Sequence, residues 1–225
     1  VASQVSPSGM TLAGKDQAGG LSIGAMVAEG MRSLPTQWSF AEESAAKHGN
    51  SVDRKNWRIV MNWHIAETRK EARLQAKEGL LRHNNDYSVA TLNPDEGTIY
   101  KSPDDAVDGV AFSENSTAVI GTPDDLIAKI KEMISITGGF GCVIGFAHDW
   151  ANRENTLKSW DLVARYVIPE INGLLDDYRE SHEFVTNNRE TWVRAREAVM
   201  NKIESNERSA EIMETQGYEG EKSKS

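Results

Sequence analysis

One turn near the start of the chain has the residue types of an anion site. Ser6 and Ser8 stand beside Gly9 where a short β-type run gives way to a helix-compatible segment. A helix that begins there would offer unpaired backbone N–H groups and the positive end of its dipole to an anion. We therefore expect a phosphate site at this turn, with hydroxyl groups beside the amides. The alternative is that Ser6 or Ser8 only caps a structural helix.

Two histidines are the candidate acid–base groups. His64 and His148 lie at or just past the ends of expected strands, and an unperturbed imidazole titrates near neutrality. Each also has a structural interpretation: His64 would be bonded within the sheet, and His148 with Asp149 would cap the last helix. Cys142 lies in the middle of an apolar strand, where we expect a buried and inert thiol.

Units of a strand followed by a helix recur along the chain, which is typical of a parallel sheet with crossover helices. The expected strands lie in the first unit, Val1–Gln17, and at Gly20–Met26, Trp57–Ala66 and Phe140–Phe146. The expected later helices run from about Pro35 to Lys47, from a capping box at Thr68 to Arg82, and from an N-cap at Thr122 to Gly138. A separate helix follows the loop at 147–150 and runs through Trp160 to about Ile171.

Two regions depart from this pattern. Residues 83–121 lose periodicity, and we expect an irregular insertion that is either a lid over the site or a disordered loop. Residues 174–216 are polar and predict a peripheral helical extension, and residues 217–225 predict a disordered tail. We find no internal repeat beyond the strand–helix rhythm. The extension has one thin apolar series: Val185, Trp192, Val199 and Ile203.

Composition excludes several function classes. The chain has 225 residues, 39% of them hydrophobic, and a net charge of -9, which argues against a nucleic-acid binder or a binder of anionic membranes. No apolar run approaches the roughly 20 residues that span a bilayer. Zinc-type Cys and His spacing is absent from the sequence, so no metal is expected. The single cysteine fits a reducing compartment, and we expect the cytoplasm.

Four strand–helix units make half of an eight-stranded barrel, which takes about 250 residues. Either a partner half exists or the strands form an open doubly wound sheet, and periodicity alone favours the open sheet. The chain opens on Val1 inside an expected strand. We therefore expect a piece of a longer protein.

Several motifs, taken in their order and spacing, resemble one family. They are Ser6-Pro7-Ser8-Gly9-Met10, His64-Ile65-Ala66-Glu67-Thr68, Ile120-Gly121-Thr122-Pro123-Asp124-Asp125, Gly138-Gly139-Phe140-Gly141 and Ala147-His148-Asp149-Trp150-Ala151. Together they resemble the C-terminal part of the luciferase-like flavin-dependent monooxygenases, the bacterial luciferase superfamily. The last two motifs are most similar to its limonene- and alkane-monooxygenase-like branch. The resemblance covers residues 1–173.

The resemblance implies the C-terminal half of a (β/α)8 TIM barrel over residues 1–173, followed by a polar helical tail. It implies reduced FMN at the carboxyl ends of the strands, with its phosphate held by Ser6, Ser8, Gly9 and Met10, and it makes His148 and His64 the catalytic candidates.

The activity implied is insertion of one oxygen atom from O2 into an apolar substrate such as a terpene, alkane or aldehyde, with reduced FMN supplied by a flavin reductase. A homo-oligomer is compatible with this. The alternatives are an F420-dependent oxidoreductase of the same superfamily and a non-catalytic flavin-binding remnant. Because the family's N-terminal half is not matched, activity of this chain by itself is an open question.

Overall fold

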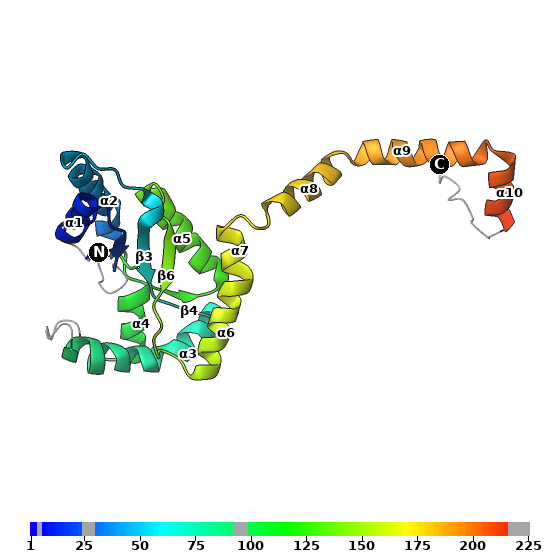
Figure 1. Cartoon of the computed structure of the whole chain (residues 1–225). Coiled ribbons are helices and arrows are strands. Elements are labelled where there is room, and N and C mark those ends of the chain that lie inside the picture. Colours follow the sequence, from blue (N-terminus) through cyan, green and yellow to red (C-terminus); the bar gives the residue numbers. More distant parts are fainter. Residues whose placement is uncertain (4–5, 24–29, 92–98, 216–225) are drawn as a thin grey trace. The chain divides into compact units, whose positions relative to one another are not determined.

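The computed structural model describes residues 1–3, 6–23, 30–91 and 99–215. The chain divides into two units, Val1–Gly173 and Leu174–Ser225. In the first unit, short parallel strands alternate with helices (Figure 1). The expected α/β class with a parallel sheet is confirmed.

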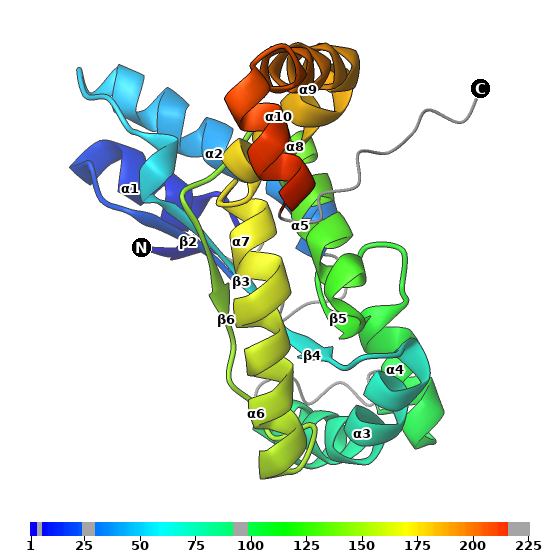
Figure 2. The same ribbon diagram turned by 90° about the vertical axis from the view of Figure 1, so that its right-hand side faces the viewer.

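The first unit contains two parallel sheets. One has four strands in the order β1 (Ala2–Ser3), β2 (Gly20–Ser22), β3 (Trp57–Met61) and β6 (Cys142–Gly145). The other pairs β4 (Trp63–Ile65) with β5 (Val119–Gly121). Figure 2 shows β3 beside β6 and β4 beside β5. Because all pairs are parallel, the carboxyl ends of β1, β2, β3 and β6 meet at one edge of the four-stranded sheet.

The expected single strand Trp57–Ala66 is divided at Asn62, and this is a correction. The carbonyl of Met61 accepts from Phe146 N at 2.9 Å, whereas the next carbonyl, of Asn62, accepts from Val119 N at 3.0 Å. Neighbouring carbonyls therefore bond to different strands, so the chain leaves one sheet and joins the other. Periodicity could not reveal this, because both halves of the segment are apolar.

Helices follow most strands. The first unit contains α1 (Ser8–Asp16), α2 (Gly30–Lys47), α3 (Arg69–Arg82), α4 (Pro103–Ala111), α5 (Pro123–Thr137), α6 (Arg153–Leu162) and α7 (Ile168–Ile171). The start expected for α2 at Pro35 is wrong, because the helix already begins at Gly30. It continues through Pro35 because Leu34 on one side and Trp38 on the other bury the same face.

Side-chain caps set the helix starts that the sequence predicted. The Thr122 side chain accepts from Asp125 N, and the Asp125 carboxylate accepts from Thr122 N at 2.9 Å, which completes a capping box at α5. Thr68 likewise accepts from Glu71 N at the start of α3. Gly138 ends α5 with φ of 74°.

The expectation of an irregular insertion over residues 83–121 is wrong. A π-helical turn, η3 (His83–Val89), continues α3, and α4 and β5 follow within this range. Ser102 caps α4, and buried Ala106 and Val107 belong to a core cluster that includes residues of α3. The Ser-Pro-Asp-Asp motif at 102–105 is thus a helix start rather than a loop. Residues 92–98, the rest of the expected lid, lie outside the described residues.

The apolar strand expected at Phe140–Phe146 is only partly buried. Cys142 is exposed, and Ile144 and Phe146 are 37% and 39% exposed. Within the described residues β6 has β3 as its single neighbour, so its other side is an open edge. The buried thiol expected at Cys142 is therefore an exposed one.

The second unit consists of α8 (Asp176–Asn187), α9 (Arg189–Glu204) and α10 (Glu207–Thr215). No residue of this unit whose burial is described is buried. The expected disordered tail, residues 217–225, lies outside the described residues. Among the described helices of the whole chain, none combines the length and apolarity that a membrane crossing needs.

Candidate active site

The turn between β1 and α1 has the expected layout of an anion site. α1 begins at Ser8, and Ser6 and Ser8 are exposed. The Ser6 hydroxyl donates to Ser8 Oγ at 3.0 Å and accepts from Ser8 N at 3.3 Å. The Ser8 hydroxyl hydrogen and the Gly9 and Met10 amides remain, and such first-turn amides have no acceptor within the helix. The first turn of α1 carries no acidic residue. These donors suit a phosphate.

Gly9 and Met10, unlike the two serines, have no side-chain group that can reach an anion. A Cβ on Gly9 would lie 2.2 Å from the carbonyl oxygen of Ala2, so glycine here allows α1 to pack directly on β1. The Met10 side chain is fully buried and belongs to the main core cluster. Both residues can therefore offer only their backbone N–H groups to an anion.

His148 lies three residues past the end of β6 and stacks on Trp150, with ring centroids 3.7 Å apart and planes inclined by 22°. Both of its ring nitrogens are buried, and neither makes a hydrogen bond of normal geometry with a described residue. A buried polar atom without a partner is costly, and a ligand that supplies the partner is one explanation for it.

The expectation that His148 titrates near neutrality is wrong. Burial, followed by the neighbouring imidazoles of His83 and His64, lowers its pKa to about 3, against small opposing effects of Asp149 and the backbone of Trp63. The imidazole is therefore neutral at physiological pH. In that form one nitrogen donates a hydrogen bond and the other accepts one.

His64 is in a different environment. It lies within β4, is 2% exposed, and its Nε2 is 2.9 Å from Oε1 of Gln75 on α3. Because that amide oxygen accepts, Nε2 carries the proton. Burial lowers the pKa of His64, and the bond to Gln75 only partly opposes this. This contact fixes the ring between β4 and α3.

His83, at the C-terminal end of α3, is the residue that sequence reasoning missed. Its Nδ1 lies 3.6 Å from Oδ1 of Asp149, and its ring centroid lies 6.4 Å from that of His148. The feature of the sequence connected with this position is Gly79, a glycine inside the helix one turn earlier. A Cβ at Gly79 would lie 2.1 Å from the carbonyl oxygen of Trp150. This close approach brings the end of α3 against the loop that carries His148.

The structural alternative for Asp149, a cap on the last helix, is wrong. The N-cap of α6 is Asn152, whose side chain accepts from Asn155 N at 2.9 Å. Asp149 is instead exposed and lies beside His83. The loop thus has its own cap residue, and His148 is not needed to start the helix.

The anion turn and His148 lie at the same edge of the sheet. Ser6 follows the end of β1 by three residues, and His148 follows the end of β6 by the same number. β1 and β6 are the two outer strands of four, and neighbouring strands are about 4.8 Å apart, so the two loops are separated by roughly 14 Å along the sheet. A ligand that reaches both must have an anionic group at one end and a hydrogen-bonding group at the other.

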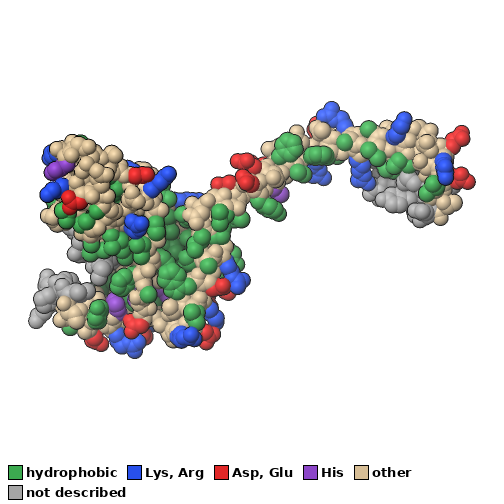
Figure 3. All heavy atoms as spheres, in the orientation of Figure 1, with side chains coloured by type: hydrophobic (Ala, Val, Ile, Leu, Met, Phe, Trp, Pro, Cys, Tyr) green, Lys and Arg blue, Asp and Glu red, His purple; other side chains and the backbone are tan. Residues whose placement is uncertain are grey.

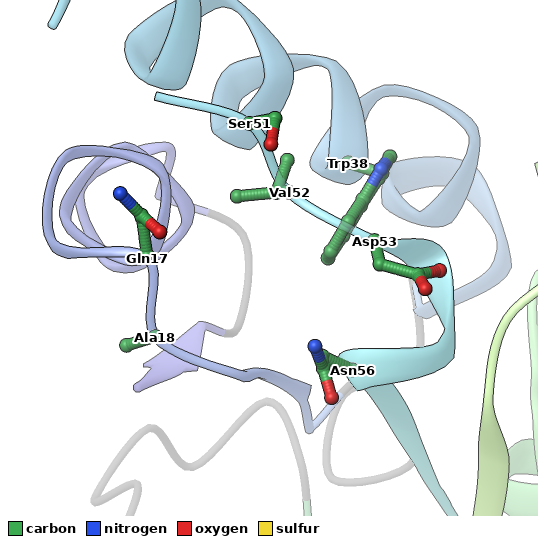
Figure 4. Close-up of a pocket in the computed structure, with 7 residues that line it drawn as sticks. All are labelled: Gln17, Ala18, Trp38, Ser51, Val52, Asp53 and Asn56. Atoms are coloured by element: carbon green, nitrogen blue, oxygen red, sulfur yellow. The ribbon is translucent and has the colours of Figure 1, made fainter. Parts of the chain in front are cut away.

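A cavity of about 220 Å³ lies at the opposite edge (Figure 4). Its lining includes Ala18, just before β2, and Asp53 and Asn56, just before β3. Ligands of parallel sheets bind at the carboxyl ends of the strands, and this cavity lies at the amino ends. It is therefore separate from the candidate site. No cluster of His, Cys, Asp or Glu among the described residues could hold a metal ion.

Comparison with known proteins gives relatives of one kind. No family model matches the chain. It is 35% identical over 187 residues to 4-hydroxyprotoasukamycin monooxygenase of Streptomyces nodosus subsp. asukaensis, a match covering 82% of this chain and 50% of that protein. It is also 35% identical over 173 residues to limonene 1,2-monooxygenase of Rhodococcus erythropolis, covering 77% and 43%. The chain thus spans about half the length of the curated relatives it matches.

Solved structures agree in fold. The oxygenating constituent of 3,6-diketocamphane monooxygenase from Pseudomonas putida, in complex with FMN, matches with a TM-score of 0.54 and 26% identity over 75% of this chain and 46% of that one. Monooxygenase RslO1 from Streptomyces bottropensis matches with a TM-score of 0.57 and 17% identity over 76% and 47%, which shows the fold alone. These likenesses confirm the expected half of a (β/α)8 barrel. The relatives that the chain matches over about three quarters of its length are monooxygenases of the luciferase-like family.

Proposed function

We propose that the protein to which these elements belong is an FMN-dependent monooxygenase that transfers one oxygen atom from O2 to an apolar substrate such as a terpene, alkane or aldehyde. The observation that carries the proposal is that an exposed turn with free first-turn amides and an imidazole whose buried nitrogens make no hydrogen bond of normal geometry lie at one edge of the sheet. Bound reduced flavin would supply the reaction with O2. The residues of this chain anchor the cofactor and shape its surroundings.

The turn fits the phosphate of FMN. The Ser8 hydroxyl and the amides of Gly9 and Met10 would hold it, while Ser6 orients the Ser8 hydroxyl through the bond between the two side chains. FMN carries its phosphate and its ring at opposite ends of one chain, which suits a turn and a histidine that are roughly 14 Å apart along the sheet. The carboxyl-edge position is also the one that active sites of (β/α)8 barrels occupy.

His148 fits a role in orienting the reacting group by a hydrogen bond. With its pKa lowered to about 3, it is a weak base, so it does not serve as a reservoir of protons at neutral pH. Its fixed, neutral ring on Trp150 can donate from one nitrogen and accept at the other. His64, which is hydrogen-bonded to Gln75, lies near His148 and would help to hold the position of its ring. We propose His148 as the catalytic residue and His64 as the second candidate.

Water exclusion is the other task of the site, because the reaction of reduced flavin with O2 must not be diverted by solvent. Trp63 and Trp150 are 8% and 2% exposed, and Trp63 packs edge-on against Trp160 at 4.8 Å. Trp63 and Trp150 each belong to a packed core cluster, which would keep water from reaching the loop through the protein interior.

The proposal also includes a flavin reductase as the partner that supplies reduced FMN, and a homo-oligomer. It places the protein in the cytoplasm, a reducing compartment that the single cysteine fits.

Titration with FMN and F420, followed by flavin fluorescence, tests the cofactor. The informative variant is Ser8→Asp, which sets a carboxylate against the phosphate, with Ser51→Asp as the control of equal charge at the opposite edge. An acidic residue in the first turn stabilises a helix by about 0.3–1 kcal/mol, so Ser8→Asp does not act by unfolding α1. We expect it to weaken FMN binding by about tenfold or more and the control to change it by less than about twofold.

Equal effects of the two variants would show that the phosphate lies elsewhere. Tighter binding of F420 than of FMN would favour the deazaflavin oxidoreductase. Bound FMN without oxygenation of limonene, when a flavin reductase, NADH and O2 are supplied to a barrel completed with the unmatched part of a relative, would favour a non-catalytic flavin-binding protein.

A further inference from the structure

The second unit carries a seven-residue repeat. Four consecutive segments begin at Tyr178, Val185, Trp192 and Val199, so the first position of each is apolar. The sixth position is glutamate in every segment: Glu183, Glu190, Glu197 and Glu204. The fifth position carries His182, Arg189, Arg196 and Ile203.

The repeat coincides with α8 and α9. Helical geometry is interrupted at Asn188, yet Asn188 N donates to Phe184 O at 3.1 Å and Trp192 N donates to Asn188 O at 3.2 Å. Hydrogen bonds that span four residues thus continue on both sides of this residue. The register of the repeat is carried from one helix into the next.

The first-position side chains are exposed to an unusual degree for apolar residues. Tyr178, Val185, Trp192 and Val199 are 76%, 54%, 51% and 58% exposed. Figure 3 shows hydrophobic side chains along the surface of α8 and α9. Helices of 12 and 16 residues that bury nothing are marginal in water, so these two need a surface to pack against.

The seven-residue pattern indicates that the surface against which α8 and α9 pack is a second helix. When two helices supercoil, the first and fourth positions of each seven-residue segment form the seam between them, and here the first positions supply its large apolar side chains. The sixth position points away from that seam, where glutamate is solvated. The fourth position, on the other flank of the seam, holds Ser181, Asn188, Ala195 and Lys202. A polar residue such as Asn in the seam fixes the register at a cost in stability. The pairing is therefore specific and weak.

We propose that residues 178–203 pair in parallel and in register with the same residues of a second copy of this chain. In a parallel pair, the fifth position of one helix faces the seventh position of the preceding segment in the other. His182 then faces Asp177, and Arg189 faces the ring of Phe184, which are complementary contacts. An antiparallel pair would place the fifth-position cations of the two copies side by side, which is repulsive.

Sedimentation velocity of the full chain, over about a hundredfold range of concentration, measures the association. The test variant is Val185→Glu with Val199→Glu, in the seam, and the control is Asn187→Glu with Asn201→Glu, at the third positions on the opposite side. Both pairs add the same charge and raise helix propensity, so neither acts by unfolding the helices, and circular dichroism checks this. We expect the seam pair to weaken dimerisation by about tenfold or more and the control pair by less than about twofold.

Disulfide cross-linking tests the orientation. In a Cys142→Ser background, Val199→Cys should form covalent dimers on mild oxidation, because parallel in-register helices bring the two copies of this position together. Asn201→Cys is the control and should not. A concentration-independent monomer, dimerisation that the seam pair leaves unchanged, or cross-linking of Val199→Cys only with Val185→Cys would each overturn the proposal.

Discussion

The pH dependence of stability is the sharpest consequence of the buried His148. In the unfolded chain its pKa returns to about 6.5, whereas in the folded chain it is about 3. Between these values the unfolded state binds a proton that the folded state does not, so the free energy of unfolding falls as the pH falls. Each pKa unit is worth 1.36 kcal/mol. From pH 8 to pH 5 the loss amounts to about 1.5 units, or about 2 kcal/mol.

The assay is urea unfolding followed by tryptophan fluorescence at pH 8 and pH 5, for the wild-type chain and for His148→Gln. The variant should lose about 2 kcal/mol less than the wild type between the two pH values. The comparison within one variant cancels whatever His148→Gln does to stability at pH 8.

Other titratable groups with lowered pKa values do not obscure the effect of His148 between pH 5 and pH 8. The bond from Arg69 lowers the pKa of Asp125 to about 2, so that carboxylate loses its contribution below about pH 4. The lowered pKa of His64 adds a loss of the same sign, and it is present in both proteins. Equal pH dependence in the wild type and in His148→Gln would show that the ring is solvated, and would remove the argument for a neutral hydrogen-bonding group.

Further predictions concern packing, capping and reactivity. Gly79→Ala should destabilise the chain by about 2 kcal/mol or more, because its methyl group would meet Trp150 O, and urea unfolding measures this. Gly145→Ala should act similarly, since its methyl group would overlap two tryptophan rings. Thr122→Ala should cost about 1 kcal/mol by removing the cap of α5, seen as a lower melting temperature. Cys142 should react with Ellman's reagent in the native chain as fast as an exposed thiol does, and a lag until unfolding would contradict its exposure.

The sequence was sufficient to predict helix ends, because the hydrogen bonds that set them join residues close together in the chain. The N-cap at Thr122 and the glycine at 138 fixed both ends of α5, and the serine-rich turn fixed the start of α1 at Ser8. These features depend on hydrogen bonds within a few residues. They could therefore be predicted without knowing what the helix packs against.

Features that depend on distant partners could not be predicted in this way. The change of sheet at Asn62 depends on two strands more than 50 residues later. The helix α4 was hidden because Ser102 and its neighbours read equally well as a loop. His83 is distant from His148 in sequence, and only the packing of Gly79 on the loop brings them together. The pKa of His148 likewise follows from burial by residues that no local pattern reveals.

The exposed edge at β6 links the fold to the proposed activity. Parallel sheets are normally covered on both faces and paired on both sides, yet Ile144 and Phe146 are more than a third exposed, and among the described residues β6, which carries Cys142, is paired on one side alone, with β3. The relatives are about twice as long as the matched region, and a closed barrel has no edges. We therefore expect that adding the part of limonene 1,2-monooxygenase that this chain does not match will cover the edge and slow modification of Cys142 by about tenfold or more. An unchanged rate of Cys142 modification would mean that β6 remains an edge strand in the complete protein, and that the missing part does not cover its apolar side chains.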